Sequence, residues 1–460
     1  MYSDDPMYTS LTQSGDLMLD NDLCNVYDPS PLVCSGADPR NSTDPLGQLP
    51  SQATAFQLET FFYHRFIDSV WLHSQADAWK EHLPAVLHKS PALYYSVMSL
   101  SALFMAKTDR NPQAKDLALS LYQATLGHLQ TALFDTSAAF EDTTLMATVI
   151  IGFYELIDKS THESWASHSR GTAELMRMRG QQNLHTGTGR MLFRTFRGFE
   201  VLRAILQVDR TFVADEAWTS ASANPQTILS SKGLLRPSTT DPPAAGSQLA
   251  TAEQPDYAAV LFMLGGQAAN LQADCAQQSS RGKLTREESS ALVDRATRIE
   301  QKLYTWRTSL PTIYNTTQAV PATTPTAVHH TSTSPNSFTI GYQLCFYAGF
   351  LLLVHRTIAK YVHRDLARVP ATDQALARMI LQTADLLTRG QTTMSLNITW
   401  PVYMSSITLL NDAERRWSLK VLRLIGVEKG WSVAKSALSA AAESARRSEL
   451  RTEQRGPQGS

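Results

Sequence analysis

The chain has 460 residues, of which 43% are hydrophobic, so it can bury one large core or several smaller ones. Its 41 lysines and arginines balance 42 aspartates and glutamates, which excludes a net positive field that would attract nucleic acid or an anionic membrane. Residues 1–19 hold neither a basic stretch nor an apolar core, so we expect no secretory signal.

Residues 1–54 are predicted to be a disordered acidic segment. Residues 1–50 hold eight aspartates and one basic residue, Arg40, with tyrosine, methionine and leucine side chains spaced among them. Acidic residues interleaved with apolar ones are typical of activation segments, which stay solvated until a partner accepts their apolar anchors. The alternative is a solvated tail without a partner.

Residues 55–218 are predicted to form the first half of an all-α, multi-helix domain of stacked antiparallel helices, because apolar residues return every three or four positions. Ser90 followed by Pro91 marks a helix start, since proline in the first turn costs no intrahelical hydrogen bond. This helix, over 91–106, is apolar nearly all round and is expected to be central. Further helices are expected over 116–134 and 143–157. An earlier apolar stripe consists of Phe61, Phe62, Phe66, Ile67 and Val70.

Residues 219–256 are rich in Ser, Thr, Pro and Ala without a sustained period, and are predicted to be a linker. Residues 257–446 are predicted to form the second helical half, interrupted by a polar loop over 315–337.

Residues 447–460 are predicted to be a disordered tail. Arginines alternate with glutamates where this tail begins, which is typical of a solvated helix face; a weak nuclear-localisation signal is the alternative.

The stretch Phe338–Val354 has no charge over 17 residues, the lower limit for crossing a bilayer. Thr339, Gln343, two tyrosines and a cysteine dilute its apolar character. We therefore predict a helix buried on all sides within the protein.

The stretch WASHSRGTAELMRMRG, Trp165–Gly180, contains residue types that could form a site. A helical zinc hydrolase needs two histidines four residues apart, but His162 and His168 are six apart. On a helix, Trp165, His168, Thr172, Leu175 and Met178 or Arg179 share one face. We predict that Gly171 allows a close helix neighbour, that Gly180 ends the helix, and that His168 is a buried, hydrogen-bonded packing residue.

Other candidate sites lack the partners that chemistry requires. Gly187-Thr188-Gly189 could bind an anion on backbone N–H groups, but no strand precedes it, so we predict an interhelix turn. The pair His329-His330 lacks convergent further ligands. No Gly-x-Ser-x-Gly nucleophile motif occurs. We therefore predict no catalytic residue, no metal site and no cofactor. No effector-binding residue is assigned from the sequence.

The four cysteines fit no common zinc pattern. Cys24 and Cys34 are separated by nine residues, and Cys275 and Cys345 fall in apolar helical segments. Free cysteines in buried helices suit a reducing compartment such as cytosol or nucleus.

A series of motifs runs in order through residues 57–440. They are WKEHLP from Trp79 with HKSPALYYSVMSLSALFMAK, LYQATLGHLQTAL, TTLMATVIIGFYELI, WASHSRGTAELMRMRG with GRMLFRTFR, YQLCFYAGFLLLVHRTI, and the tryptophan-proline segment from Trp400. This order resembles the regulatory region of fungal zinc-binuclear-cluster transcription factors. The resemblance implies an entirely α-helical domain that binds effectors or partners and does not catalyse a reaction.

The same family reads DNA with six N-terminal cysteines that hold two zinc ions, followed by a basic linker. Only two cysteines precede residue 57 here, so none of those ligands carries over to a position of this sequence. Three alternatives follow: the cluster was lost, an upstream exon supplies it, or the protein acts through a DNA-bound partner.

The resemblance implies a nuclear transcriptional regulator of a secondary-metabolite gene cluster or a nutrient pathway. Its expected partners are a DNA-bound transcription factor or the transcription machinery, a small apolar effector, or a second subunit in a homo- or heterodimer. We expect neither a membrane nor direct nucleic-acid binding by this chain. An effector pocket is expected among the helices over 90–106, 144–157 and 338–354. The alternatives are a metabolite-binding protein or enzyme on the same helices, and a scaffold that dimerises with full-length relatives.

Overall fold

The computed structural model describes residues 51–70, 73–158, 162–219, 256–310, 335–363, 369–389, 398–428, 437–443 and 446. Within these ranges every regular element is helical and no strand occurs, which confirms the predicted all-α class. Residues 1–50 of the predicted acidic segment, most of both predicted linkers and the C-terminal tail lie outside the described residues, whereas residues 52–54, predicted to be disordered, begin a helix.

The chain divides into two compact units. Unit 1 comprises the described parts of Met1–Gly180, Gln391–Thr399 and Arg415–Ser460, and unit 2 those of Gln181–Gly390 and Trp400–Glu414. The predicted domains 55–218 and 257–446 are continuous in the chain and stay predictions, because each compact unit combines segments that are far apart in the chain.

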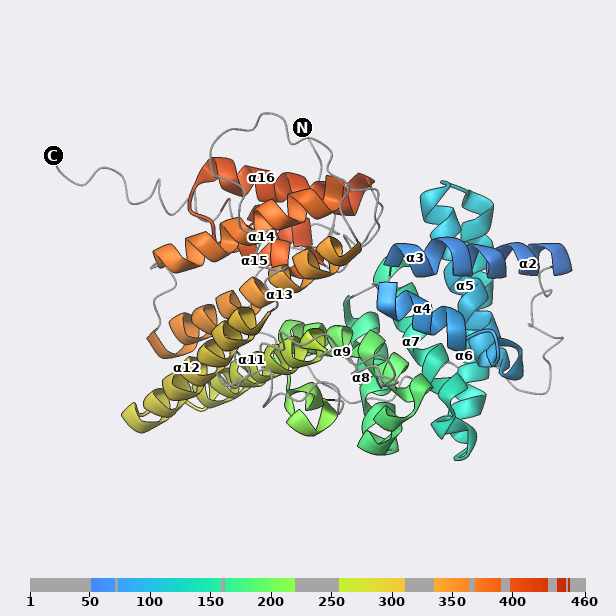
Figure 1. Ribbon diagram of the computed structural model, residues 1–460, viewed down its shortest axis with the longest axis horizontal. Helices are drawn as coiled ribbons and strands as arrows, with labels where there is room; N and C mark the ends of the chain where they lie inside the picture. Colours follow the sequence, from blue (N-terminus) through green and yellow to red (C-terminus); the bar gives the residue numbers. More distant parts are fainter. Residues whose placement is uncertain are drawn as a thin grey trace, which may run out of the picture. The chain divides into compact units, whose positions relative to one another are not determined.

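Unit 1 contains seven complete α-helices among its described residues (Figure 1). They are α2 (Gln52–Phe61), α3 (Ile67–Val70), α4 (His73–His82), α5 (Pro91–Thr108), α6 (Pro112–Phe134), α7 (Asp142–Asp158) and α8 (His162–Arg179). Helix α5 packs against α2, α6 and α7, which makes it central to this unit as predicted.

The start of α5 follows its sequence signal. The Ser90 side chain accepts a hydrogen bond from the backbone N–H of Leu93, and Pro91 occupies the first turn. Helix α6, by contrast, begins at Pro112, four residues before the predicted start. Asn111 caps it by accepting from two backbone N–H groups, so Asn-Pro was a second cap signal, ahead of the apolar pattern.

An aromatic cluster forms the core of unit 1. Phe66 lies edge-on to Phe104 of α5 with ring centroids 5.3 Å apart, and edge-on to Phe153 of α7 at 6.0 Å. Phe62 stacks on Phe66 at 5.1 Å. The predicted stripe is thus confirmed at Phe62, Phe66 and Ile67, which are fully buried.

Among the described residues, the core of unit 2 consists of five helices that pack against one another (Figure 1). They are α9 (Gly187–Gln207), α11 (Tyr257–Ser280), α12 (Arg286–Ser309), α13 (Pro335–Ile358) and α14 (Ala371–Arg389), followed by α15 (Thr399–Thr408) and α16 (Asp412–Arg423), which each cross a unit boundary. A capping box, in which Thr285 and Glu288 exchange hydrogen bonds, starts α12.

The uncharged stretch predicted to be a buried helix forms most of α13. From Ile340 to Val354 its side chains are buried or nearly so, against α11, α12 and α14. Among the described residues no helix has both the length and the apolar character needed to span a bilayer. The buried-helix interpretation is confirmed for the described part of this stretch.

Two consecutive glycines let α11 approach its neighbours closely. A Cβ on Gly265 would lie 2.3 Å from the Phe350 ring of α13, and one on Gly266 would lie 2.8 Å from the backbone nitrogen of Ala214. Glycine inside a helix is unfavourable by about 1 kcal/mol relative to alanine. Here that cost is offset by packing on two sides of the helix.

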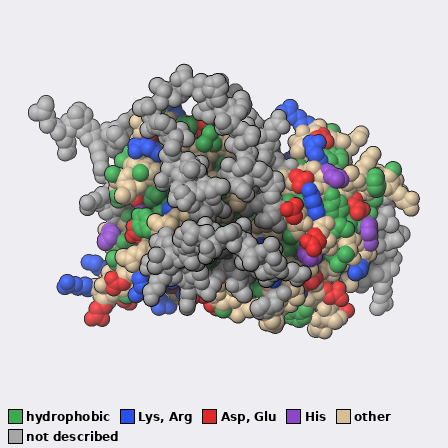
Figure 2. All heavy atoms as spheres, viewed as in Figure 1, with side chains coloured by type: hydrophobic (Ala, Val, Ile, Leu, Met, Phe, Trp, Pro, Cys, Tyr) green, Lys and Arg blue, Asp and Glu red, His purple; other side chains and the backbone are tan. Residues whose placement is uncertain are grey.

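Charged side chains of both signs are interspersed over the described surface seen in Figure 2. This distribution agrees with the balanced composition. A binding site for a charged ligand in this protein therefore has to be a local cluster.

Candidate functional site

Helix α8 carries the stretch Trp165–Gly180. Trp165, Thr172 and Met176 are buried, so the helix packs one face inward as predicted. Of the two alternatives at the end of this face, Met178 is wrong because it is 66% exposed, whereas the Arg179 side chain is only 10% exposed; Leu175 is half-buried. Gly171 is exposed and nothing lies within 4 Å of a Cβ placed on it, so the predicted close neighbour is wrong.

The end of α8 follows the prediction. Gly180 has φ of 78°, and its N–H donates to the carbonyl oxygens of Met176 and Arg177. A residue without Cβ adopts this left-handed conformation at little cost. Arg179, one residue earlier, forms an ion pair with Asp142 at the start of α7. The Arg-Gly ending therefore serves to stop one helix and fasten it to another.

His168 is half-buried and faces a carboxylate. Its Nε2 lies 3.7 Å from Oε1 of the buried Glu155 on α7, and the Tyr122 hydroxyl of α6 donates to the same Glu155 oxygen. Burial lowers the pKa of His168, and the Glu155 charge opposes that shift. The arrangement joins three helices of unit 1, which agrees with a packing role although the ring is more exposed than predicted.

The Gly187-Thr188-Gly189 sequence lies at the start of α9. Thr186 caps this helix by accepting from the Gly189 N–H at 2.9 Å, and a Cβ on Gly189 would lie 2.0 Å from the Asn183 carbonyl oxygen. The Gly189 N–H is thus already bonded, and the three residues form the first turn of α9, so the predicted interhelix turn at these positions is wrong.

Among the described residues no group of three or more His, Cys, Asp or Glu side chains is placed to bind a metal ion. Cys275 and Cys345 are free and buried, as their apolar segments predicted. Burial raises the pKa of the Cys275 thiol to about 12 and raises that of Cys345 as well. Both thiols stay protonated at neutral pH and pack as small apolar groups. Cys24, Cys34 and His329-His330 lie outside the described residues, as do the side chains of His162 and Glu163.

An ion-pair cluster in unit 2 joins α9 to α11 across the predicted linker. Asp256 accepts from Arg194 at 3.1 Å and from two nitrogens of Arg197 at 3.2 Å. The same carboxylate caps α11 by accepting from the Ala259 N–H at 2.9 Å. Burial favours the neutral acid, but Arg197 and Arg194 outweigh it and lower the pKa of Asp256.

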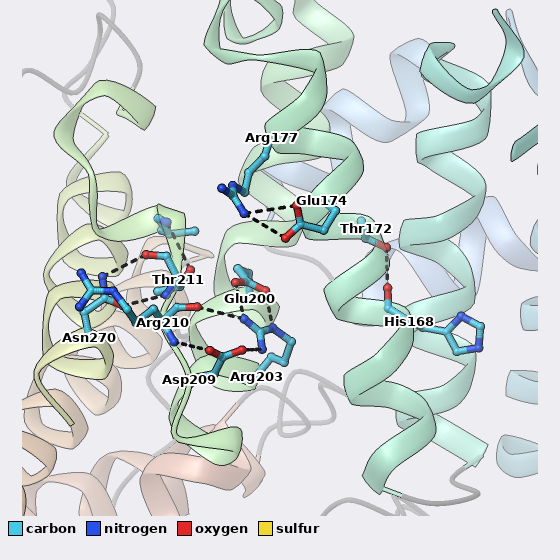
Figure 3. A network of polar contacts seen from close by, with 11 residues as sticks. His168, Thr172, Glu174, Arg177, Glu200, Arg203, Asp209, Arg210, Thr211 and Asn270 are labelled. Atoms are coloured by element: carbon cyan, nitrogen blue, oxygen red, sulfur yellow. Dashed lines mark hydrogen bonds and ion pairs between the residues drawn. The ribbon is translucent and has the colours of Figure 1, made fainter. Parts of the chain in front are cut away.

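A second cluster fastens the turn that follows α9 (Figure 3). Arg203 donates to both oxygens of Glu200 at 2.8 Å, with both side chains almost fully buried, and to Asp209 at 2.8 Å. Val208, which lies between Arg203 and Asp209 in the chain, has φ of 51°, a left-handed conformation that a β-branched residue rarely adopts. Such backbone strain persists only where surrounding interactions hold it.

The same turn is also held by α11. The Asn270 side chain accepts from the Thr211 N–H at 2.7 Å and donates to the Thr211 carbonyl oxygen at 3.1 Å (Figure 3). Gln267, one turn earlier on α11, donates to the Ala214 carbonyl oxygen at 3.3 Å. The side chains of Arg203 on α9 and of Asn270 and Gln267 on α11 thus hold the backbone of residues 208–214.

A cavity of about 270 Å3 lies where this turn meets α11 and α12. Its lining consists of Ala214, Gln267, Asn270, Arg295, Arg298, Ile299 and Lys302. These residues belong to unit 2 and are mainly polar or basic. Their sequence pattern does not mark a site, since cations three and four residues apart on a helix are also typical of a solvated face.

The predicted effector pocket concerned other helices. Those over 90–106 and 144–157 belong to unit 1, whereas the one over 338–354 belongs to unit 2. An apolar pocket among them stays a prediction.

Comparison with known proteins identifies the domain. The family described as fungal specific transcription factor domain matches residues 56–440, which confirms the resemblance inferred from the ordered motifs. A stretch of 99 residues is 26% identical to the uncharacterized protein AN5342 of Emericella nidulans, covering 22% of this chain and 21% of that protein. The match thus spans about a fifth of that relative's length. No solved structure matches the chain. The chain therefore belongs to the family defined by the fungal specific transcription factor domain.

Proposed function

We propose that the protein is a nuclear transcriptional regulator that controls a secondary-metabolite biosynthetic gene cluster or a nutrient pathway. The observation that supports this role is the family domain over residues 56–440, which is a transcription factor domain. The all-α architecture of the described residues is the one that the family resemblance implies.

The proposed mechanism of these 460 residues is contact with other proteins or with an effector. Its support is the sequence of the first 50 residues, which has eight aspartates, one arginine and only two cysteines. The partners would be a DNA-bound transcription factor or the transcription machinery, and the acidic segment would be the recruiting element. A homo- or heterodimer is a further form of the same proposal.

The test is deletion of the gene followed by RNA sequencing, with the intact gene reintroduced as a control. We expect transcripts of the neighbouring genes to fall on deletion and to recover on complementation. Unchanged transcripts across the genome would overturn the regulatory role. Sequencing the 5′ end of the transcript tests the indirect mechanism separately, because an in-frame upstream exon with six cysteines would make the product a direct DNA binder.

A second candidate is a metabolite-binding or enzymatic protein, and the cavity beside α12 favours it. The deletion strain distinguishes the two candidates. An accumulated precursor with normal transcripts, together with turnover by the purified chain, would support the second. Lowered transcripts without any turnover would support the first.

A further inference from the structure

The cavity in unit 2 has an excess of positive charge. Arg295, Arg298 and Lys302 line it, and their spacing of three and four residues places them on one face of α12. Asp274 on α11 binds Arg295 and Arg210, and Glu216 lies 3.7 Å from Lys302. Four cations therefore face two carboxylates in this cluster, which leaves a net charge of two positive.

Arg298 carries much of that excess. Among the described residues no carboxylate forms an ion pair with it, although the three other cations of the cluster each have one. A guanidinium presents several N–H donors in a fixed planar fork, which matches the oxygens of a carboxylate or phosphate. Arg298 is thus free to bind an anion in this way, and Lys302 one turn away can add a point charge.

The rest of the cavity suits a small organic molecule. The buried side chain of Ile299 supplies an apolar surface between the cations. The volume of about 270 Å3 is just below the roughly 300–1,000 Å3 of pockets that take drug-sized ligands. A macromolecular segment would extend beyond it.

One wall of the cavity is fixed before any ligand binds. Asn270 holds Thr211 through two hydrogen bonds, Gln267 holds Ala214, and a Cβ on Gly266 would contact the same backbone. A preformed wall lowers the ordering cost of binding.

We propose that this cavity binds a small organic dianion, a molecule with two carboxylates or with one phosphate group. Arg298 binds one anionic group through its fork, Lys302 adds charge, and Ile299 contacts the carbon skeleton. As an effector site the cavity rests on the proposed regulatory role, but the binding is a property of the purified chain. Its failure and the failure of regulation are therefore observed in different experiments.

The test is binding of succinate and of inorganic phosphate to the purified full chain, with acetate as the monoanion. Thermal shift and isothermal titration calorimetry are run at constant ionic strength, because screening weakens such contacts. We expect succinate or phosphate to raise the melting temperature in a saturable manner, with a dissociation constant on the order of 1 mM or lower and a weaker effect from acetate.

Three variants make this test specific. Arg298→Gln should weaken binding at least about tenfold, and Arg298→Lys should fall between it and the parent, because lysine keeps the charge without the fork. Arg286→Gln is the matched control: Arg286 is an exposed cation in the first turn of the same helix and does not line the cavity, so binding should be unchanged.

Two results would overturn the proposal. One is a stabilisation that rises without saturation or is equal in Arg298→Gln, since that reflects a general salt effect. The other is tighter binding of a peptide covering residues 1–30, displaced by neither anion, since that would assign the surface to an acidic peptide. In both cases the transcript measurements on the deletion strain still decide the regulatory role.

Discussion

Helix α7 in unit 1 and helix α11 in unit 2 are both buried on nearly every side, yet different interactions hold them. α7 packs on α5 mainly through apolar side chains, and its Phe153 lies edge-on to Phe66. Its polar contacts include those of Glu155 and Asp142 with α6 and α8. α11 begins at a carboxylate that binds two arginines, and it holds a neighbouring turn through Asn270. An apolar helical sequence thus predicts burial, but it does not say which interactions hold the helix or what they are sensitive to.

Removing the central ring of the aromatic cluster should have the largest effect. Phe66→Ala leaves a cavity in a fully buried site and is expected to lower the stability of unit 1 by about 3–5 kcal/mol. Hydrogen exchange of the α5 and α7 amides measures this locally. Phe56→Ala is the control, because Phe56 on α2 is 72% exposed and should cost little. Equal losses from the two variants would show that the cluster is not the core.

Neutralising the carboxylate at the start of α11 should cost slightly less. Asp256→Asn leaves the buried Arg197 without its charge partner, and we expect a loss of about 3 kcal/mol in α9 and α11. Glu174→Gln removes an exposed pair with Arg177 on α8 and should change stability by less than about 1 kcal/mol. If both variants behaved alike, ion pairs would not explain how α11 is held.

Adding one methyl group should affect the two helices with opposite sign. Gly266→Ala brings a Cβ within 2.8 Å of the Ala214 backbone, and we expect a loss of about 1–3 kcal/mol. Gly152→Ala on α7 meets nothing within 4 Å and should gain about 0.5–1 kcal/mol from helix propensity. Thermal melts of both variants check this, and a gain from Gly266→Ala would mean that the close approach is absent.

Unit 2 should also respond to pH through His355. This imidazole lies 2.6 Å from Asp373 and 3.3 Å from Glu300, which in turn interacts with Tyr304. Burial disfavours the charged ring, but the hydrogen bond to Asp373 and the charges of Asp373 and Glu300 outweigh it and raise the pKa of His355. Its stabilisation is therefore complete below about pH 6.5 and is lost as the pH rises through the raised value.

The measurement is the melting temperature of the parent and of His355→Gln from pH 6 to pH 9. We expect the difference to be largest at pH 6 and to shrink as the pH rises. Asp373→Asn should also reduce the pH dependence, because it removes the shorter of the two contacts. A difference that is constant across this range would refute the charged pairing.

Local signals were readable where they depend on neighbouring residues. Ser90-Pro91 marked the start of α5 and Gly180 the end of α8, because caps involve atoms within a few positions. The predicted start of α6 is wrong because its apolar period begins only at residue 116, whereas the cap at Asn111 starts the helix at Pro112. The prediction for Gly171 is wrong for a different reason. Periodicity indicates which residues share a helix face, but it does not say whether another helix packs against that face.

The sequence by itself determined the all-α class, the central burial of α5 and α13, and, through the order of its motifs, the family. Only the tertiary structure decided the contacts of unit 2. Thr211 and Asn270 bond to each other across 59 positions, as do Arg197 and Asp256. The residues that line the cavity come from positions as far apart as Ala214 and Lys302. Helix periodicity is set by each residue's near neighbours, whereas an ion pair or a cavity wall depends on which distant helices pack together, and this pairing is not contained in any local pattern.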